Sequence, residues 1–441
     1  MPSENDFDAP PEPFTDPNLD PMFGAPPVED EPESRPGGLP LYVWVVMAVG
    51  IAIPIGLAWG EGARALELLP NLIMRALTAL AAPLVVMAIL HAIVTNDIRG
   101  RQGAMMMFLY LINTIVAMLI GLGLSNLIRP GLGASLGDAG GSAAPIAQKS
   151  ASELVVELIP RSIGEAFATN NIAQLVVLTL ALGIGLVKIR NAHREAGREE
   201  FQTVVNLLSI GFELLMKVLL WVVALVPFAV LGVVASRVGQ PDGMRIFLSL
   251  IWLILVVVLG LGCQVCWYLL QMAVFARMSP LRFLGGAADV MANTFSTAST
   301  AATIPITLKS LGRMGVSRQS SQLCACIGTN FNNDGTALYQ ATAALFMAQA
   351  LGFTLSLTDQ ILVVMTTLVA SVGAGGIPSG SFVTMPLIFA AVRLPADKIP
   401  ILLTIDWFLD RCRTTSNVLG DMTVAVLLDK IAPPGAEPAE A

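Results

Sequence analysis

Long runs of apolar residues, separated by short polar segments, make up most of this chain. Six runs approach or exceed the ~20 residues that an α-helix needs to cross a bilayer. They lie at about 40–60, 66–96, 103–128, 170–190, 201–237 and 244–277. The runs lack the ~10-residue alternation of apolar and polar positions that is typical of a transmembrane β-barrel. The pattern therefore predicts an all-α polytopic membrane protein.

The pattern changes after about residue 283, where polar and helix-breaking residues interrupt the apolar stretches. The chain reads STASTAATIPIT at 296–307 and SVGAGGIPSGS at 371–381, each between short apolar arms. Unpaired backbone groups are not tolerated in lipid, so such breaks must be covered by protein or line a wet cavity. We predict two re-entrant helical hairpins, at about 283–312 and 356–392, with tips near Ala301–Pro305 and Ala374–Ser381. Two kinked ordinary helices are the alternative.

Two further segments complete a predicted transmembrane domain at 39–432. They are a broken helix at about 317–350 and a last helix at about 397–431. With the six runs they give eight transmembrane helices and two hairpins. A matched pair of interrupted segments is the best sequence indication of a transporter's binding site.

The composition agrees with a membrane domain and sets the chain ends apart. Of the 441 residues, 55% are hydrophobic and 13% are charged, against roughly 25% charged in soluble domains. Residues 1–38 are acidic and rich in proline, so we predict a disordered tail. This segment has neither the basic start nor the apolar centre of a signal peptide. A ligand-binding tail is the alternative, and 433–441 is also predicted to be disordered.

The basic residues predict an orientation. Lys and Arg follow the second, fourth and sixth apolar runs and the first hairpin. Because cytoplasmic loops are enriched in these residues, we expect a multi-pass protein of the plasma (inner) membrane with both termini cytoplasmic. The Gly/Ala/Ser-rich segment at 131–160 should face outside. The five cysteines lie in apolar segments, and without a second CxxC or a His cluster they are predicted to be packing residues.

The last segment concentrates polar side chains on one face. At ~100° per residue, these side chains fall within an arc of about 100° around a helix. They are Asp406, Asp410, Arg413, Thr414, Asn417 and Asp421. Each charge inside a bilayer costs at least ~2.5–3.5 kcal/mol on insertion scales, which favours a functional stripe that faces a polar cavity. The alternative is an internal ion pair between Asp410 and Arg413 that only stabilises the helix.

The stripe indicates recognition of a small zwitterion with an acidic side chain. Arg413 offers a planar fork that suits a carboxylate, and Asp410 offers acceptors for an ammonium group. Free backbone N–H groups at a half-helix start suit a second carboxylate. Further candidate contacts are Ser299, Thr300, Thr336 and Asn417.

The segment NFNNDGTALYQ at 330–340 places polar residues at membrane depth between two apolar stretches. A break at Asn333–Gly335 frees backbone carbonyls, and oxygen groups on unwound backbone are the ligands of hard cations. We therefore predict a sodium site next to the zwitterion site, with a merely polar kink as the alternative. The candidate oxygen donors are Asn332, Asp334, Asn417, Asp421 and carbonyls near Gly328.

Several of these motifs resemble one family. NNDGTALYQ is similar to the NMDGT motif of the glutamate transporter family, the dicarboxylate/amino acid:cation symporters. DWFLDRCRTTSNVLGD resembles the family's final helix, and ELIPRSIGEAF resembles a segment before its fourth helix. STASTAATIP and SVGAGGIPSG fall where the family has its re-entrant loops. The resemblance covers about residues 40–431.

The resemblance implies a homotrimer in which each protomer has a fixed scaffold and a mobile transport domain that moves like an elevator. It implies that Arg413 holds the side-chain carboxylate of the ligand and Asp410 its amino group. Thr336, Thr414 and Asn417 would complete the pocket, and Thr300, Gly376, Ile377 and Ser381 would close it. One sodium ion would bind Gly328, Asn332, Asn417 and Asp421, a second Asn330, Ser371, Val372 and Ala374, and a third Tyr110, Asn113, Thr114, Asn332 and Asp334.

The sequence departs from the family pattern at four places. Asn333 replaces the usual Met between Asn and Asp, which bears on the coupling of ion binding to gate closure. Ala301 and Ala374 each stand where the family has a hydroxyl. Gln340 stands where the proton-coupled animal members have Glu, which argues against that proton route. Arg413 is usually lacking in members specific for neutral amino acids, so its presence favours an acidic substrate.

The leading hypothesis is a symporter that takes up aspartate or glutamate with sodium, without an organic cofactor and without nucleic acid as a partner. A proton-coupled C4-dicarboxylate carrier or a neutral amino acid symporter is the close alternative. A channel would need a continuous polar pore, whereas the polar residues here cluster at one depth. An intramembrane protease would need its own paired motif, and the LGD here lacks the first Gly of GxGD. We therefore do not expect this protein to be an enzyme.

Overall fold

The computed structural model describes residues 41–95, 100–134, 156, 159–198, 200–240, 243–374 and 380–432. These residues are mostly helical, and none of them is in a β-strand, so the all-α prediction is confirmed for this part of the chain. The predicted tails at 1–38 and 433–441 and most of the 131–160 segment lie outside the described residues.

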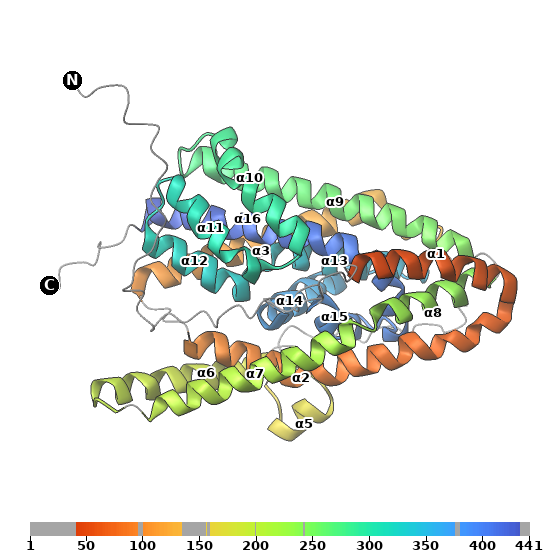
Figure 1. The fold of residues 1–441 in the computed structure, drawn as a ribbon, viewed down its shortest axis with the longest axis horizontal. Helices are drawn as coiled ribbons and strands as arrows, with labels where there is room; N and C mark the ends of the chain where they lie inside the picture. Colours follow the sequence, from red (N-terminus) through yellow and green to blue (C-terminus); the bar gives the residue numbers. More distant parts are fainter. Residues whose placement is uncertain are drawn as a thin grey trace. The chain divides into compact units, whose positions relative to one another are not determined.

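One group of helices is built from the first and middle parts of the chain (Figure 1). Helix α1 packs along α8, and α2 packs against α6, α7 and α8. The bounds are α1 Leu41–Trp59, the 3-10 helix η2 Gly60–Glu67, α2 Leu68–Thr95, α5 Ile163–Ala168, α6 Ile172–Glu195, α7 Phe201–Val223 and α8 Val226–Val238.

The run at 201–237 forms two helices, not the single segment that its apolar pattern predicted. Helix α7 ends at Val223 and α8 begins at Val226. Pro227 lies in the first turn of α8, where a proline has no N–H to donate to the preceding turn. The chain therefore breaks just before this proline.

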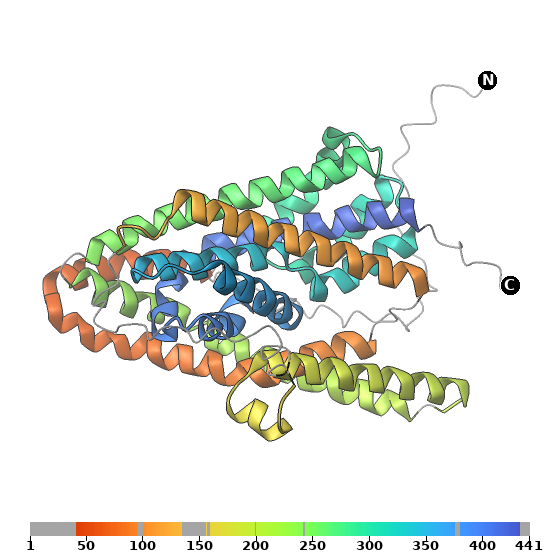
Figure 2. The same cartoon turned by 180° about the vertical axis from the view of Figure 1, so that it is seen from behind.

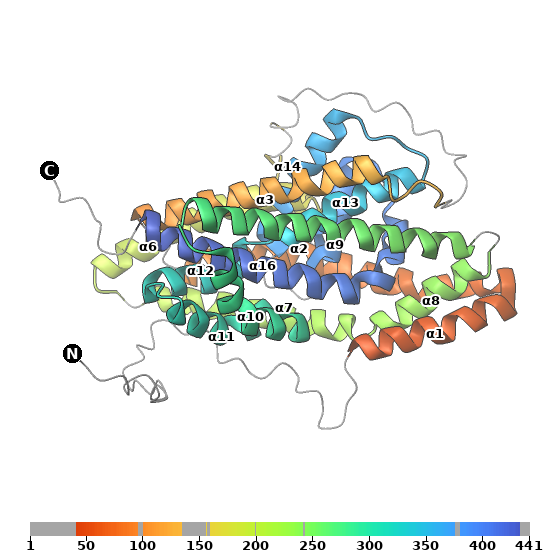
Figure 3. The ribbon, with the colours of Figure 1, turned by 90° about the horizontal axis from the view of Figure 1, so that it is seen from above.

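A second group of helices surrounds the last helix, α16. Helix α3 runs beside α9 (Figures 2 and 3) and packs along α13, while α16 packs along α9, α10 and α12. The bounds are α3 Gly100–Ile128, α9 Gly243–Val274, α12 Arg318–Phe331, α13 Asp334–Ala350, the 3-10 helix η3 Ala396–Leu402 and α16 Leu403–Ile431. The last helix predicted at 397–431 thus starts as the 3-10 helix η3, which contains Pro400.

Two helical hairpins pack against this group. The first consists of α10 (Pro280–Thr297) and α11 (Thr300–Arg313), and the second of α14 (Leu357–Ala374) and α15 (Gly380–Ala391). The first turn lies at Ala298, with φ of 54°, and Ser299. It does not lie at the predicted Ala301–Pro305, because a left-handed alanine ends α10 and α11 continues through its proline. The second predicted tip lies largely outside the described residues.

Five stretches of the described residues are long and apolar enough to cross a membrane. They are Leu41–Thr95, which contains α1 and α2, Arg101–Ile128, Gln174–Glu195, Phe201–Val238 and Arg245–Val274. Large apolar side chains such as Trp221 and Leu214 are exposed on these helices, as expected for surfaces that face lipid. The chain is therefore a polytopic helical membrane protein.

Candidate functional site

The break between α12 and α13 lies at Asn332 and Asn333. The N–H of Asn332 still donates to the carbonyl of Gly328 at 2.7 Å, but the Asn332 backbone is extended. Asp334 is already the first residue of α13. The break therefore starts one residue before the predicted Asn333–Gly335, and it leaves the end of one half-helix beside the start of another. Such ends present unpaired carbonyl and N–H groups to a ligand.

The break is bound directly to α16. The side-chain amide of Asn332 donates to the Asn417 carbonyl at 2.8 Å and to Asp421 Oδ1 at 2.9 Å. The N–H of Gly335 donates to Asn417 Oδ1 at 2.8 Å. Asn417 thus accepts hydrogen bonds from both sides of the break.

Glycine at position 335 permits this close approach. A Cβ atom there would lie 2.8 Å from the Arg413 carbonyl oxygen and 3.0 Å from the Arg413 Cα. Both atoms are backbone, so one of the two helices would have to move.

Gly335→Ala is therefore expected to lower the free energy of unfolding by about 1–3 kcal/mol, the usual cost of overpacking. Thermal unfolding of the detergent-solubilised protein measures the change. Gly262→Ala is the matched control, because a Cβ atom on Gly262 meets no atom within 4 Å. Equal unfolding temperatures for the two variants would contradict the close contact between α13 and α16.

Two buried carboxylates lie on either side of the break. Asp334 accepts hydrogen bonds from Thr114 Oγ1 at 2.6 Å and from the Tyr268 hydroxyl at 2.7 Å. Asp421 accepts from the Asn332 amide. All these donors are neutral, and within the described ranges neither carboxylate has an ion-pair partner. Because buried charge is costly without a counter-charge, this arrangement favours a bound cation.

The oxygen atoms around the break suit a hard cation. Asn332 Oδ1 is buried and has no hydrogen-bond partner within the described residues, so it is a vacant acceptor. The Tyr110 hydroxyl donates to the Cys324 carbonyl at 3.2 Å, one turn before Gly328. The structure thus brings Tyr110, Asn332 and Asp421 to one end of the break, and Thr114 and Asp334 to the other.

Asn113 has a different environment from the one predicted. Its Oδ1 accepts from Trp267 Nε1 at 3.0 Å and from Gln271 Nε2 at 2.6 Å, both on α9. Its carbonyl accepts from Gln264. The side-chain oxygen therefore already has two donors, and the described contacts connect Asn113 to α9 and not to Asp334.

Arg413 lies at the centre of a second charged group. It is 1% exposed, and its Nη2 lies 2.8 Å from Asp406 Oδ1 and 2.8 Å from Asp410 Oδ1. Its guanidinium stacks on the Tyr339 ring at 4.2 Å. The pairing with Asp410 that was the alternative to a functional stripe is present, and Asp406 joins it. Two carboxylates and one guanidinium leave a net charge of −1.

These partners do not use all the N–H donors of the Arg413 guanidinium. Its Nε and Nη1 atoms are buried and lack a hydrogen-bond partner in the described part of the chain. Nη2 also reaches Ser381 Oγ on α15 at 3.4 Å. The Asp410 side chain is 26% exposed, whereas that of Asp406 is 7% exposed. The group thus offers vacant donors beside one accessible carboxylate.

The remaining predicted residues have varied positions. Ser299 Oγ caps α11 by accepting from the Ala302 N–H, and Thr300 begins that helix. Thr414 donates to the Asp410 carbonyl within α16. Thr336 is half-buried in the first turn of α13. Gly376 and Ile377 lie outside the described residues, as do the side chains of Asn330, Ser371, Val372 and Ala374, although their backbones are in α12 and α14.

Sequence reasoning gave no role to two side chains that contact the charged groups, Tyr268 and Tyr339. It placed Asp406 on the polar stripe but did not pair it with Arg413. Each of the two tyrosines places a phenol in an otherwise apolar stretch, and the chain has only four tyrosines. That rarity was the available signal. Gln340 also contacts α15, through Thr384 Oγ1 at 2.6 Å and the Ser381 carbonyl at 3.3 Å. These contacts connect α13, the helix that follows the break, to the second hairpin.

Comparison with known proteins gives a consistent result. The profile of the sodium:dicarboxylate symporter family matches residues 41–431. The chain is 30% identical to a neutral amino acid transporter B(0) of Oryctolagus cuniculus, covering 90% of this chain and 82% of that protein. It is 26% identical to a C4-dicarboxylate transport protein of Solibacter usitatus, covering 88% and 92%. It is also 26% identical to excitatory amino acid transporter 4 of Mus musculus, covering 82% and 77%.

Proposed function

We propose, because this chain belongs to the sodium:dicarboxylate symporter family, that it takes up aspartate or glutamate in symport with sodium ions. Membership of the family makes the chain a membrane symporter of amino acids or dicarboxylates, and a transporter rather than an enzyme. One observation carries the narrower proposal. Arg413 has buried, vacant donors next to Asp410, the more exposed of its two carboxylate partners.

The charges of this group suit an acidic amino acid. The ammonium of the substrate binds Asp410, and its side-chain carboxylate binds the vacant edge of Arg413 as a charge-assisted pair. The net charge of −1 favours a ligand that carries an ammonium over a simple diacid. In the proposal the pocket is completed by Thr336, Thr414 and Asn417, and is closed by Ser299, Thr300, Gly376, Ile377 and Ser381.

Sodium ions supply the missing positive charge at the break. Asp334 and Asp421 contribute two buried negative charges. Among the described residues, the hydrogen-bond donors to these two carboxylates are neutral. We assign one ion to Gly328, Asn332, Asn417 and Asp421, a second to Asn330, Ser371, Val372 and Ala374, and a third to Tyr110, Asn113, Thr114, Asn332 and Asp334. Asn113 has to exchange its α9 donors to join the third site. Asn417 belongs to the first sodium set and to the substrate pocket, and it couples the two.

The proposed architecture follows the same family. It consists of eight transmembrane helices and two re-entrant hairpins, divided into a fixed scaffold and a transport domain that moves as an elevator. In the proposal, helices α3, α9, α12, α13 and α16 form the transport domain together with the two hairpins. Helix α3 packs along α13, and α16 packs along α9, α10 and α12. The proposed assembly is a homotrimer in the inner membrane, with both termini cytoplasmic.

A neutral amino acid is the second candidate substrate, and one contact favours it. Arg413 already pairs with both Asp406 and Asp410, so its charge is balanced without a substrate carboxylate. The relatives named as neutral amino acid transporters also favour this candidate.

Uptake into proteoliposomes with an imposed sodium gradient decides between the two candidate substrates. We expect labelled aspartate to accumulate, and we expect unlabelled serine or succinate to compete poorly with it. Strong competition by serine, without competition by succinate, would favour the neutral amino acid. Accumulation of aspartate without a sodium gradient would contradict coupling to sodium.

Asp410→Ala tests the role of the ammonium partner. The variant is expected to weaken aspartate uptake by about 30-fold or more, since truncation of a charged hydrogen-bond partner costs at least about 2 kcal/mol. Inhibition by succinate, which has no ammonium, should change far less. Competition curves for both ligands in the same vesicles measure the difference. An equal loss for both ligands would make Asp410 a structural residue.

A further inference from the structure

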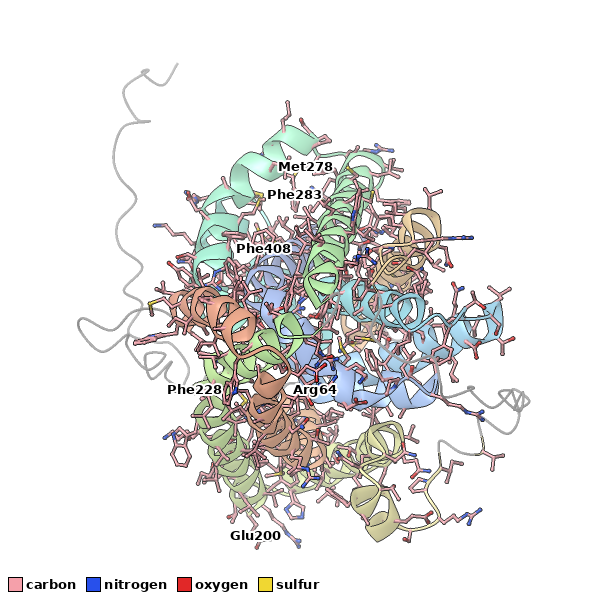
Figure 4. The ribbon with its side chains drawn as sticks, turned by 90° about the vertical axis from the view of Figure 1, so that its right-hand side faces the viewer. Arg64, Glu200, Phe228, Met278, Phe283 and Phe408 are labelled. Carbon is pink, nitrogen blue, oxygen red and sulfur yellow. The ribbon has the colours of Figure 1, made fainter. Side chains whose placement is uncertain are left out.

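A separate cavity lies where α9 turns into α10, at the far end of α16 from Asp406. Its volume is about 260 Å³. The α9–α10 turn, the α11–α12 turn and the last residues of α16 line it together. Met278 lies in the first of these turns, close to Phe283 of α10 (Figure 4). None of the residues assigned to substrate or sodium lines this cavity.

The cavity is positively charged. Arg277, Arg282 and Lys430 line it, and none of the three forms an ion pair with another described residue. Its one carboxylate is Asp429, whose Oδ1 accepts the N–H of Ser317 at 3.2 Å. Three cations and one carboxylate leave a net charge of +2. A cavity of this charge suits a doubly or singly charged anion.

Arg277 occupies a backbone position that normally favours glycine. Its φ is 52°, in the left-handed region. The residue lies three positions after Val274, where α9 ends, and the N–H of the following Met278 donates back to the Met272 carbonyl at 3.0 Å. Glycine adopts this conformation without strain, and strained non-glycine residues concentrate at binding sites. The backbone therefore favours glycine at this position, whereas the side chain of the arginine adds a positive charge to the cavity.

The surroundings of the cavity are apolar and exposed. Phe275 is 60% exposed and Leu281 is 80% exposed, on either side of Arg277 and Met278. Met278 and Met314 form part of the cavity wall. Because α9 is long and apolar enough to cross a membrane, its end lies at the membrane surface. Basic pockets at this level are typical binding sites for anionic lipid headgroups.

We propose that this cavity binds a phosphate group. The headgroup of an anionic phospholipid supplies that phosphate most directly, because the exposed apolar side chains then contact the acyl chains. A soluble phosphate is the other source of the same chemistry. The proposal does not depend on which substrate is transported.

Arg277→Gly is the sharpest test, because glycine adopts the left-handed backbone without strain. The variant should therefore fold at least as well as the native protein while losing one phosphate ligand. Arg393→Gly is the matched control, because Arg393 also has a left-handed backbone, with φ of 56°, but does not line the cavity. A second variant, Arg282→Gln with Lys430→Gln, removes two charges and is matched by Lys309→Gln with Arg318→Gln outside the cavity.

Native mass spectrometry of the purified protein, titrated with phosphatidylglycerol or phosphatidylcholine, measures the binding. We expect saturable, preferential retention of phosphatidylglycerol, weakened about fivefold by Arg277→Gly and about tenfold or more by the double variant. Both control variants should bind as the native protein does. Circular dichroism and thermal unfolding establish that each variant is folded.

Excess inorganic phosphate distinguishes the sources. If the site binds lipid, phosphatidylglycerol stays bound in excess phosphate. If the site binds soluble phosphate, phosphate binds and phosphatidylglycerol is released. Either result supports the proposal if the cavity variants lose binding of that ligand. Equal binding by cavity and control variants would overturn the proposal. The proposal would also be overturned if the native protein bound no inorganic phosphate and did not prefer phosphatidylglycerol to phosphatidylcholine.

Discussion

Arg413→Cys is expected to lower the affinity for aspartate by at least about 100-fold. Removal of one partner of a buried, hydrogen-bonded charge pair costs about 2–5 kcal/mol or more, and each 1.4 kcal/mol is tenfold in affinity. The variant loses the only cation near Asp406 and Asp410 among the described residues within ion-pair distance. The two carboxylates then repel the acidic side chain of a substrate. We expect measurable uptake of serine or alanine to replace uptake of aspartate.

Arg411→Cys is the matched control for this experiment. It removes the same charge two residues away on the same helix, about 160° around the helix axis. The guanidinium of Arg411 lies over the Tyr42 ring at 4.9 Å, away from the Asp406 and Asp410 carboxylates. Aspartate affinity should stay close to that of the native protein. If Arg413→Cys transports aspartate as well as Arg411→Cys does, Arg413 does not bind the substrate.

The second large effect is expected for Asp421→Asn. The amide oxygen of asparagine can still accept from the Asn332 amide, so the contact between the break and α16 is kept. The negative charge that attracts a cation is lost. The sodium concentration that gives half of the maximal aspartate binding should rise by about 30-fold or more, which corresponds to about 2 kcal/mol.

Asp289→Asn controls for the removal of a carboxylate elsewhere on the protein. Asp289 forms an exposed ion pair with Arg313 at 3.0 Å, and such pairs contribute at most about 1 kcal/mol. Sodium dependence of aspartate binding should not change in this variant. Sodium titrations of both variants, at constant ionic strength, make the comparison; unaltered sodium dependence in Asp421→Asn would remove this carboxylate from the cation site.

The sequence was sufficient for features that depend on local spacing. The polar stripe from Asp406 to Asp421 follows from the helical period, because six polar side chains recur on one face of α16. The interruption near Asp334 follows from four polar residues and a glycine in an apolar stretch. Its position was wrong by one to two residues, since Asp334 and Gly335 already belong to α13.

Features that depend on contacts between distant elements were missed. The family resemblance implied that Asn113 binds an ion, but α9 presents Trp267 and Gln271 to its side-chain oxygen. Tyr339 lies under Arg413 only because α13 packs on α16. The tip of the first hairpin was misplaced because a left-handed alanine has no sequence signature, whereas Pro305 suggested a break that the helix tolerates.

In the proposed mechanism, the two charged groups are coupled through Asn417. The break binds Asn417 from both sides, and Arg413 and Asp421 lie one turn away from it in either direction. In the proposed site, a cation at Asp421 fixes Asn417, the residue proposed to complete the substrate pocket. Substrate and sodium should then bind cooperatively, each raising the affinity for the other by the same factor.

Calorimetric titration of the purified protein with aspartate, in sodium and in choline salt at equal ionic strength, tests this claim most directly. We expect saturable binding in sodium, an affinity that rises steeply with sodium concentration, and little or no binding in choline. Equal aspartate affinity in both salts would contradict it.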